Sequence, residues 1–163
     1  MKTIFLLLGA VIFFSCNRPA ANTQALEKRI DSLEKKLATS YTPGLGEFMS
    51  SIQVHHAKLW FAGQAQNWEL ADFEIAEIKE SLEDIPVFCA NRPETAKLGM
   101  ILPAIDSISK AINTKNPQLF KSGFVLLTAS CNNCHQATGH GFNNIIIPAN
   151  PPFSNQAFVP QHK

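Results

Sequence analysis

One stripe of residues between 117 and 135 constrains the fold of this chain more than any other feature. Its members follow one another at spacings of four, three, four and three: Phe120, Phe124, Leu127, Cys131 and Cys134. Residues spaced in this way share one face of an α-helix, because three and four residues are each close to one helical turn. The stripe therefore predicts a helix that turns its apolar side chains and both thiols into the interior of a helical protein.

The two thiols of this stripe belong to the run Cys131-Asn132-Asn133-Cys134-His135. The C-x-x-C-H spacing is the attachment signal for c-type haem, in which two thiols add across the vinyl groups and the His ligates the iron. On a helix the three side chains meet, so that His135 lies beside the ring that the thiols hold. We predict one covalent haem c, with Cys131 and Cys134 as thioethers and His135 as the proximal iron ligand.

Three other interpretations of this run stay open. A zinc site needs four ligands, usually from two such cysteine pairs, and the remaining cysteines, Cys16 and Cys89, form no second pair. A thioredoxin-like dithiol belongs near a βαβ pattern, and the sequence shows none. A chance match is the third interpretation. An export signal at the start of the chain favours haem, because c-type haem is attached outside the cytoplasm.

Residues 1–15 resemble a bacterial lipoprotein signal peptide. A basic residue precedes an apolar run that is too short to cross a bilayer as a mature helix. Ser15 and Cys16 fit the family's cleavage site, whereas Phe13 and Phe14 depart from its preference for Leu and a small residue. The resemblance implies that Cys16 is acylated and anchors an exported protein to a membrane, facing the periplasm or the cell exterior. Ordinary secretion with cleavage nearby is the alternative.

The mature part of the chain is one domain's worth of sequence. Without residues 1–15, roughly 145 residues remain, which is the usual size of a single domain. The formal net charge is +1 and there is no basic run, so the sequence argues against a nucleic-acid partner. Membrane contact is expected through the lipid and not through a basic patch.

Residues 16–45 form a lipid-anchored tether with a short heptad helix. A short polar linker comes first. Charged residues then separate four apolar residues that are spaced four, three and four: Leu26, Ile30, Leu33 and Leu37. This is less than two full heptads, a length at which an isolated helix is marginal. Two alternatives stay open. The helix is a spacer that forms a homo-oligomer through 26–37, or it packs on the rest of the chain or stays half-formed.

Residues 46–135 contain four amphipathic stretches with short connections. This pattern predicts an all-α protein, an antiparallel four-helix bundle with haem at one end. The first helix is expected from about 47 to 62. The second follows Asn67, a good N-cap, and stops near Pro86.

Prolines and asparagines mark the later helices. Pro93 is expected in the first turn of the third helix, where its missing N–H costs nothing. Pro103 lies inside the same apolar pattern and predicts a kink or a late true start. Asn116 repeats the cap signal before the fourth helix, which carries the cysteine stripe. The haem is therefore aimed into the bundle interior.

A haem motif near the end of the last of four helices resembles the class II c-type cytochromes, the cytochrome c prime type. The resemblance covers 46–135 and implies haem on Cys131 and Cys134 with His135 as proximal ligand. Three runs are similar, more narrowly, to a set of uncharacterised bacterial haem proteins: 56–63, 67–68 and 151–156.

The chain departs from class II because it continues past the motif, over residues 136–163. The run 145–147 is too apolar to stay exposed to solvent, and four prolines between 136 and 163 prevent a long helix. We expect an extended C-terminal strap laid back over the bundle or the haem edge. A mobile terminus is the alternative.

The residue on the other side of the iron decides the function. In an up-and-down bundle the start of the first helix lies at the same end as the end of the fourth, which makes Met49 the candidate distal ligand. Low-spin class II members likewise take a Met from early in the first helix. Met100 is a second candidate, and a role as core filler is the alternative for Met49. His56 lies ~10 Å further along the helix at 1.5 Å per residue and suits the pocket wall.

Ligation by Met and His would make the chain a membrane-anchored electron-transfer protein with an unidentified redox partner protein. The alternative is a gas-binding protein or sensor for NO, CO or O2 with an open sixth site. We expect no enzyme, because a peroxidase needs an acid–base pair above an open iron and only His56 offers one half of it.

Overall fold

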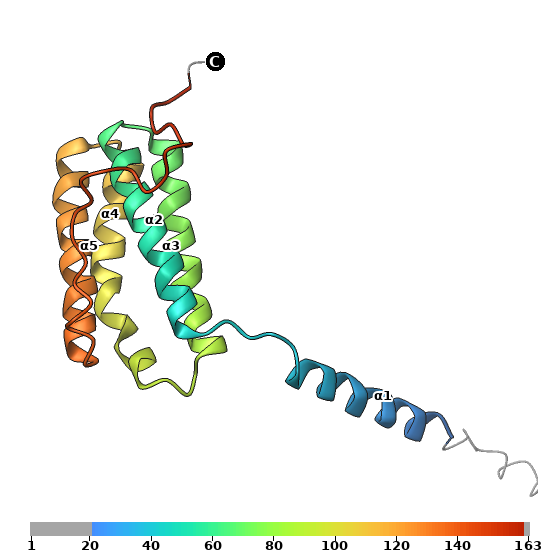
Figure 1. Cartoon of the computed structure of the whole chain (residues 1–163). Coiled ribbons are helices and arrows are strands. Elements are labelled where there is room, and N and C mark those ends of the chain that lie inside the picture. Colours follow the sequence, from blue (N-terminus) through green and yellow to red (C-terminus); the bar gives the residue numbers. More distant parts are fainter. Residues whose placement is uncertain (1–20, 162–163) are drawn as a thin grey trace, which may run out of the picture. The chain divides into compact units, whose positions relative to one another are not determined.

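The computed structural model describes residues 21–161, and within that range the protein is all-helical, without a β-strand. The predictions for the signal peptide 1–15 and for lipidation at Cys16 lie outside the described residues. The helices follow in chain order: α1 (Ala21–Ala38), α2 (Leu45–Gln64), α3 (Trp68–Phe88), the 3-10 helix η1 (Pro93–Ile101), α4 (Leu102–Asn113) and α5 (Pro117–Ala137). Figure 1 shows α2 to α5 side by side, which is compatible with a helical bundle. The all-α prediction is confirmed.

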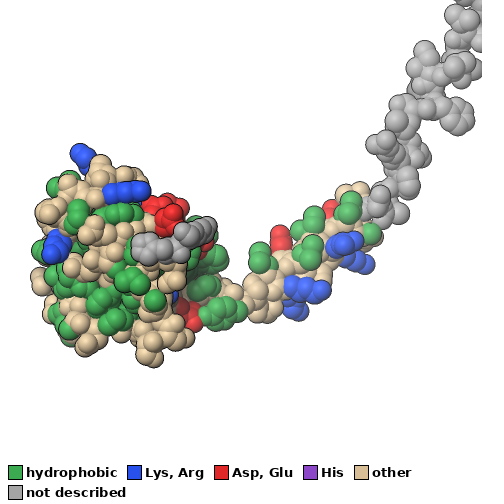
Figure 2. Space-filling model, turned by 90° about the horizontal axis from the view of Figure 1, so that it is seen from above, with side chains coloured by type: hydrophobic (Ala, Val, Ile, Leu, Met, Phe, Trp, Pro, Cys, Tyr) green, Lys and Arg blue, Asp and Glu red, His purple; other side chains and the backbone are tan. Residues whose placement is uncertain are grey.

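The chain divides into two units, and the second begins at Thr42. The first unit contains α1, so the heptad run is helical, as predicted. Its apolar side chains are exposed: Leu33 keeps 56% of its surface, and Figure 2 shows such side chains beside Lys and Arg on this helix. Among residues 21–161, no helix combines the length and the apolar character that crossing a membrane requires.

The second unit is built around one hydrophobic core. Its largest fully buried apolar side chains come from α2, α3, α4 and α5: Leu59, Ile75, Ile78, Ile85, Ile108, Phe120, Phe124 and Leu127. Full burial of a side chain of this size stabilises a fold by ~1.5–3 kcal/mol. The stripe that the sequence placed on the last helix is thus the core face of α5.

Short polar residues and prolines set the helix ends. The Asn67 side chain accepts a hydrogen bond from a backbone N–H in the first turn of α3. Asn116 accepts from two backbone N–H groups at the start of α5. Pro103 marks a late start, because residues 93–101 form a 3-10 helix and the α-helix begins only at Leu102. The predicted caps and the predicted late start are confirmed.

Residues 138–161 form no regular helix and lie against the second unit's helices. Phe158 is buried, and its ring centroid lies 5.6 Å from that of Phe61 in α2. Lys58 Nζ of the same helix lies 5.5 Å from the Phe153 ring centroid. In Figure 1 the segment leaves the end of α5 and runs back along the helices. The prolines keep it extended, and aromatic contacts hold it on α2.

Candidate functional site

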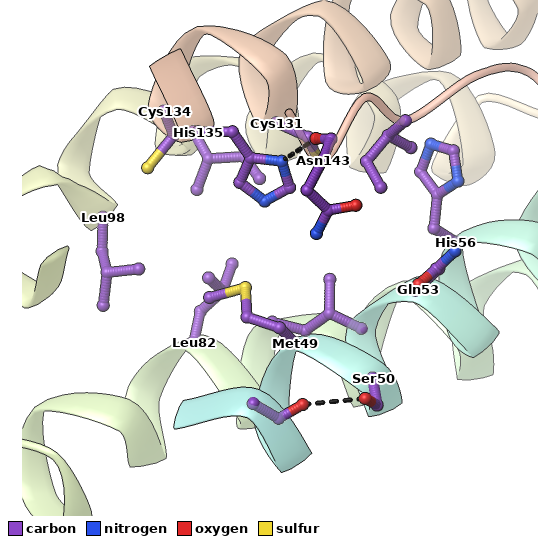
Figure 3. A pocket seen from close by; sticks show the side chains of 14 residues that line it. Met49, Ser50, Gln53, His56, Leu82, Leu98, Cys131, Cys134, His135 and Asn143 are labelled. Atoms are coloured by element: carbon purple, nitrogen blue, oxygen red, sulfur yellow. Dashed lines mark hydrogen bonds between the residues drawn. The ribbon is translucent and has the colours of Figure 1, made fainter. Parts of the chain in front are cut away.

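A cavity of about 200 Å³ opens at the end of the second unit where α2 begins and α5 ends. Its wall is mostly apolar. One side is lined by Cys131, Cys134 and His135 of α5. Figure 3 shows the Met49 sulfur of α2 facing the His135 imidazole across the cavity. The structure therefore brings the predicted attachment motif and the predicted distal ligand together.

The two thiols lie in surroundings that keep them protonated. The pKa of Cys131 is raised to about 11, mainly by burial and to a smaller extent by the neighbouring Cys134 thiol. Burial likewise raises the pKa of Cys134, whose Sγ lies 3.9 Å from the carbonyl oxygen of Lys97. Redox dithiols and zinc ligands act instead as thiolates, and their settings lower the pKa. The surroundings of both thiols therefore differ from those of a reactive thiolate.

His135 is oriented by the C-terminal segment. Its Nδ1–H donates a hydrogen bond of 2.7 Å to the backbone carbonyl oxygen of Asn143. A carbonyl oxygen can only accept, so a proton lies on Nδ1, and in the neutral imidazole the lone pair then lies on Nε2. Metal-ligating histidines commonly donate their second ring N–H in this way, which fixes the tautomer and the ring orientation. The imidazole is thus held in the form that an iron ligand needs.

The same segment is bound by a second residue of the motif. The Asn132 Nδ2–H donates to the carbonyl oxygen of Ile145 at 2.8 Å, and the Ile145 N–H donates to Asn132 Oδ1 at 2.7 Å. Asn143 and Ile145 both line the cavity. The C-terminal segment therefore forms part of the cavity wall next to His135.

The two candidate methionines are placed differently. Met49 is half-buried and packs against the core at the cavity. Met100 lies outside the cavity wall and keeps 42% of its surface exposed. A thioether must reach the cavity to act on anything bound there, which leaves Met49 as the methionine in position for ligation.

His56 lines the cavity as a neutral, buried side chain. It is 3% exposed, and burial lowers its pKa from 6.5 to about 4. Thr128 Oγ1 donates to the Phe124 carbonyl and lies 2.9 Å from His56 Nε2, so His56 Nε2–H is the donor in that pair. The sequence prediction of a role in the pocket wall agrees with this position.

The residues of the cavity fit an iron porphyrin better than a bare metal ion. Within residues 21–161, no group of three or more His, Cys, Asp or Glu side chains is arranged to hold a metal. Haem iron needs no such group, because the ring nitrogens supply four ligands and the protein supplies the axial ones. The cavity is smaller than the ~300–1,000 Å³ of most ligand pockets.

No protein-family model, no curated protein and no solved structure matches this chain. The likeness to class II c-type cytochromes, and to the narrower set of bacterial haem proteins, therefore stays a prediction. It depends on the attachment motif, on the motif's late position and on the helices before it.

Sequence reasoning expected the C-terminal segment over the bundle or the haem edge, but it missed the hydrogen bonds of this segment with Asn132 and His135. The motif leaves its two central positions free, so spacing does not distinguish Asn132 from Asn133. Nothing local to Asn143 indicates that its carbonyl meets His135. The signal in the sequence is the apolar run 145–147, which predicts burial. Only Ile145 is half-buried, whereas Ile146 and Ile147 are exposed.

Proposed function

We propose that this chain is a monohaem c-type cytochrome of the class II kind, an antiparallel four-helix bundle with haem c bound through Cys131 and Cys134. His135 is the proximal iron ligand and Met49 the distal one. The protein transfers electrons on the exported side of a membrane, to which a lipid on Cys16 anchors it.

One observation carries this proposal. The three side chains of the attachment motif and the Met49 sulfur line opposite walls of one apolar cavity, although they come from the last and the first helix of the second unit. A chance C-x-x-C-H run has no reason to face a cavity. It has still less reason to face a thioether across that cavity.

The chain's own groups have defined tasks in this proposal. Haem supplies one-electron exchange at its iron when bound. Cys131 and Cys134 hold the ring, and the Asn143 carbonyl keeps the proton of His135 on Nδ1. Met49 offers a soft, neutral donor that raises the reduction potential and leaves no axial position for a substrate. The apolar walls keep water away from the centre.

A neutral His56 on the cavity wall favours a second candidate function. A polar side chain beside an open sixth position decides which diatomic ligand binds there. His56 Nε2 is engaged with Thr128, and Nδ1 keeps its lone pair. With Met49 displaced, the chain would be a gas-binding protein or sensor for NO, CO or O2.

The ferric holoprotein tests the proposal through its electron paramagnetic resonance and optical spectra. We expect a low-spin iron with a Met-to-iron charge-transfer band in the wild type. Met49→Ala should abolish that band and leave a high-spin or water-ligated iron. Met100→Ala is the matched control, because Met100 is exposed and lies outside the cavity, and it should leave both spectra unchanged.

Other outcomes would redirect the proposal. A purified chain without covalent haem would contradict it altogether. A high-spin wild type that Met49→Ala does not alter would establish an open site and give the gas-binding function precedence. A low-spin spectrum that survives Met49→Ala but not Met100→Ala would show that η1 moves when haem binds.

A further inference from the structure

We infer that residues 143–145 clamp the axial histidine and that Asn132 is the positioning residue that closes this clamp. The inference rests on the proposed function, because it concerns the ligand His135. It goes beyond that function by assigning a role to one of the two free positions in the attachment motif. It also assigns a role to a segment that class II proteins lack.

Asn132 holds the backbone of one residue, Ile145, by both polar groups of its side-chain amide. Its amide donates to the Ile145 carbonyl and accepts from the Ile145 N–H. Such a two-point contact fixes the orientation of the backbone and not only its distance. The Asn143 carbonyl, two residues earlier, is thereby held at His135 Nδ1.

Burial fixes little of this stretch, and one backbone hydrogen bond, from the Asn143 N–H to the His140 carbonyl oxygen at 2.8 Å, holds it from its N-terminal side. Phe142 keeps 85% of its surface and Ile146 keeps 67%, and Asn143 and Asn144 are exposed as well. Only Ile145 is half-buried, against the cavity. Because burial contributes so little between 142 and 147, the local restraints on the Asn143 carbonyl are the Asn143–His140 backbone bond before it and the two Asn132 bonds after it.

The clamp has a chemical consequence for the iron ligand. An imidazole that donates its Nδ1–H to a carbonyl is more electron-rich at Nε2 and keeps one ring orientation. A stronger His donor favours the ferric state over the ferrous state. Loss of the clamp should therefore raise the reduction potential and loosen the ring.

The neighbouring motif position provides the control. Asn133 has the same side chain and also lies between the two cysteines, but it is exposed. Asn132→Ala removes both bonds to Ile145, whereas Asn133→Ala leaves them in place. Any effect of altering the motif itself on haem attachment should appear in both variants.

Redox potentiometry of the holoproteins gives the first measurement. Loss of a partner behind a metal ligand typically changes affinity 10- to 100-fold. At the tenfold end of this range, the preference of the site for ferric over ferrous iron changes by a factor that corresponds to ~59 mV for one electron. We expect an upward shift of this order in Asn132→Ala and none in Asn133→Ala.

Amide hydrogen exchange gives a second measurement that does not involve the iron. The Ile145 N–H should be protected in the wild type and in Asn133→Ala, and should exchange at least tenfold faster in Asn132→Ala. Ile145→Pro breaks the same hydrogen bond by deleting its donor, the Ile145 N–H, and leaves the attachment motif unchanged. It should raise the potential as Asn132→Ala does, which covers the case in which Asn132→Ala fails to attach haem.

The outcomes separate the clamp from the proposed function. Equal potentials and equal Ile145 exchange in Asn132→Ala and Asn133→Ala would overturn the clamp while leaving the haem protein intact. A wild-type chain that carries no haem contradicts the proposed function, and the role toward the iron ligand fails with it. The exchange comparison, which needs no haem, would then still decide whether Asn132 holds the segment.

Discussion

The two ends of the second unit use the same pair of helices, α2 and α5, to opposite effect. Where α2 ends and α5 begins, aromatic rings fill the interface: the Trp60 and Phe124 centroids lie 4.8 Å apart, and Trp68 meets Phe120 edge-on at 6.0 Å. Where α2 begins and α5 ends, the same interface opens into the cavity lined by the attachment motif. The same two helices thus border a filled region at one end and a cavity at the other.

This difference shows how much stability a binding cavity costs a small helical protein. At ~24 cal/mol per Å³, a cavity of about 200 Å³ costs on the order of 5 kcal/mol, and less when its mouth admits water. The whole stability of a domain is only ~5–15 kcal/mol. The packing at the filled end must therefore compensate for the stability that the empty cavity costs, until a ligand occupies the cavity.

Truncation of a ring at the filled end should have the largest effect on stability. Phe124 is fully buried, and its ring lies 4.4 Å from that of His56 and 4.8 Å from that of Trp60. Phe124→Ala should lower the free energy of unfolding by about 3–5 kcal/mol. Leu98→Ala at the hollow end removes a half-buried side chain from an existing cavity, so it should cost less than about 2 kcal/mol.

Urea unfolding of the two variants, followed by circular dichroism, measures this contrast. The comparison between a filled and a hollow end would be wrong if Leu98→Ala cost as much as Phe124→Ala. Helical content before unfolding checks that both variants retain the native fold.

The free energy of unfolding should also decrease as the pH is lowered, because of His56. This side chain is buried at the boundary between the two ends. Burial lowers the pKa of His56 from 6.5 to about 4, so the unfolded chain takes up a proton before the folded one does. The contribution is complete above pH 6.5 and is lost as the pH falls toward 4, by about 3 kcal/mol in total.

His56→Gln isolates this effect, because Gln does not titrate and still offers an N–H near Thr128. The free energies of unfolding of wild type and variant should converge as the pH is lowered from 7.5 to 4.5. Parallel pH dependences would show that the pKa of His56 is the same in the folded and the unfolded chain, which would contradict a pKa lowered by burial.

Local sequence signals were enough for the helices and for the side of the cavity that α5 lines. The spacing of Phe120 to Cys134 predicted the core face of α5, and Asn67 and Asn116 predicted the helix starts. Met49 could be assigned to the level of the motif because an up-and-down chain brings the first and last helices together. Each of these inferences needs only residues within a few turns, or the order of the helices.

Long-range polar pairs could not be predicted in this way. Glu74 lies in the apolar face of α3 and is fully buried, because His55 Nδ1 meets one carboxylate oxygen at 2.7 Å and Lys58 Nζ lies 4.0 Å from the other. The contacts of Asn132 with Ile145 are of the same kind. A pattern of spacing reports which face a residue is on, but not which polar group another element brings to it.

The smallest effect concerns two glycines of α2, one at each end of the helix. A Cβ on Gly63 would lie 2.0 Å from Phe120 Cζ, and the Phe120 ring is confined between Trp60 and Trp68. Gly46 lines the cavity, and a Cβ there meets nothing within 4 Å.

Gly63→Ala should therefore destabilise the protein by about 1–3 kcal/mol through overpacking, even though Ala is the better helix former. Gly46→Ala should be neutral or stabilise it by up to ~1 kcal/mol through helix propensity alone. Chemical unfolding of the two variants beside the wild type measures both signs. Destabilisation by Gly46→Ala equal to that by Gly63→Ala would mean that the start of α2 is as tightly packed as its end. Opposite signs would show that one helix changes from spacious to close packing within its own length.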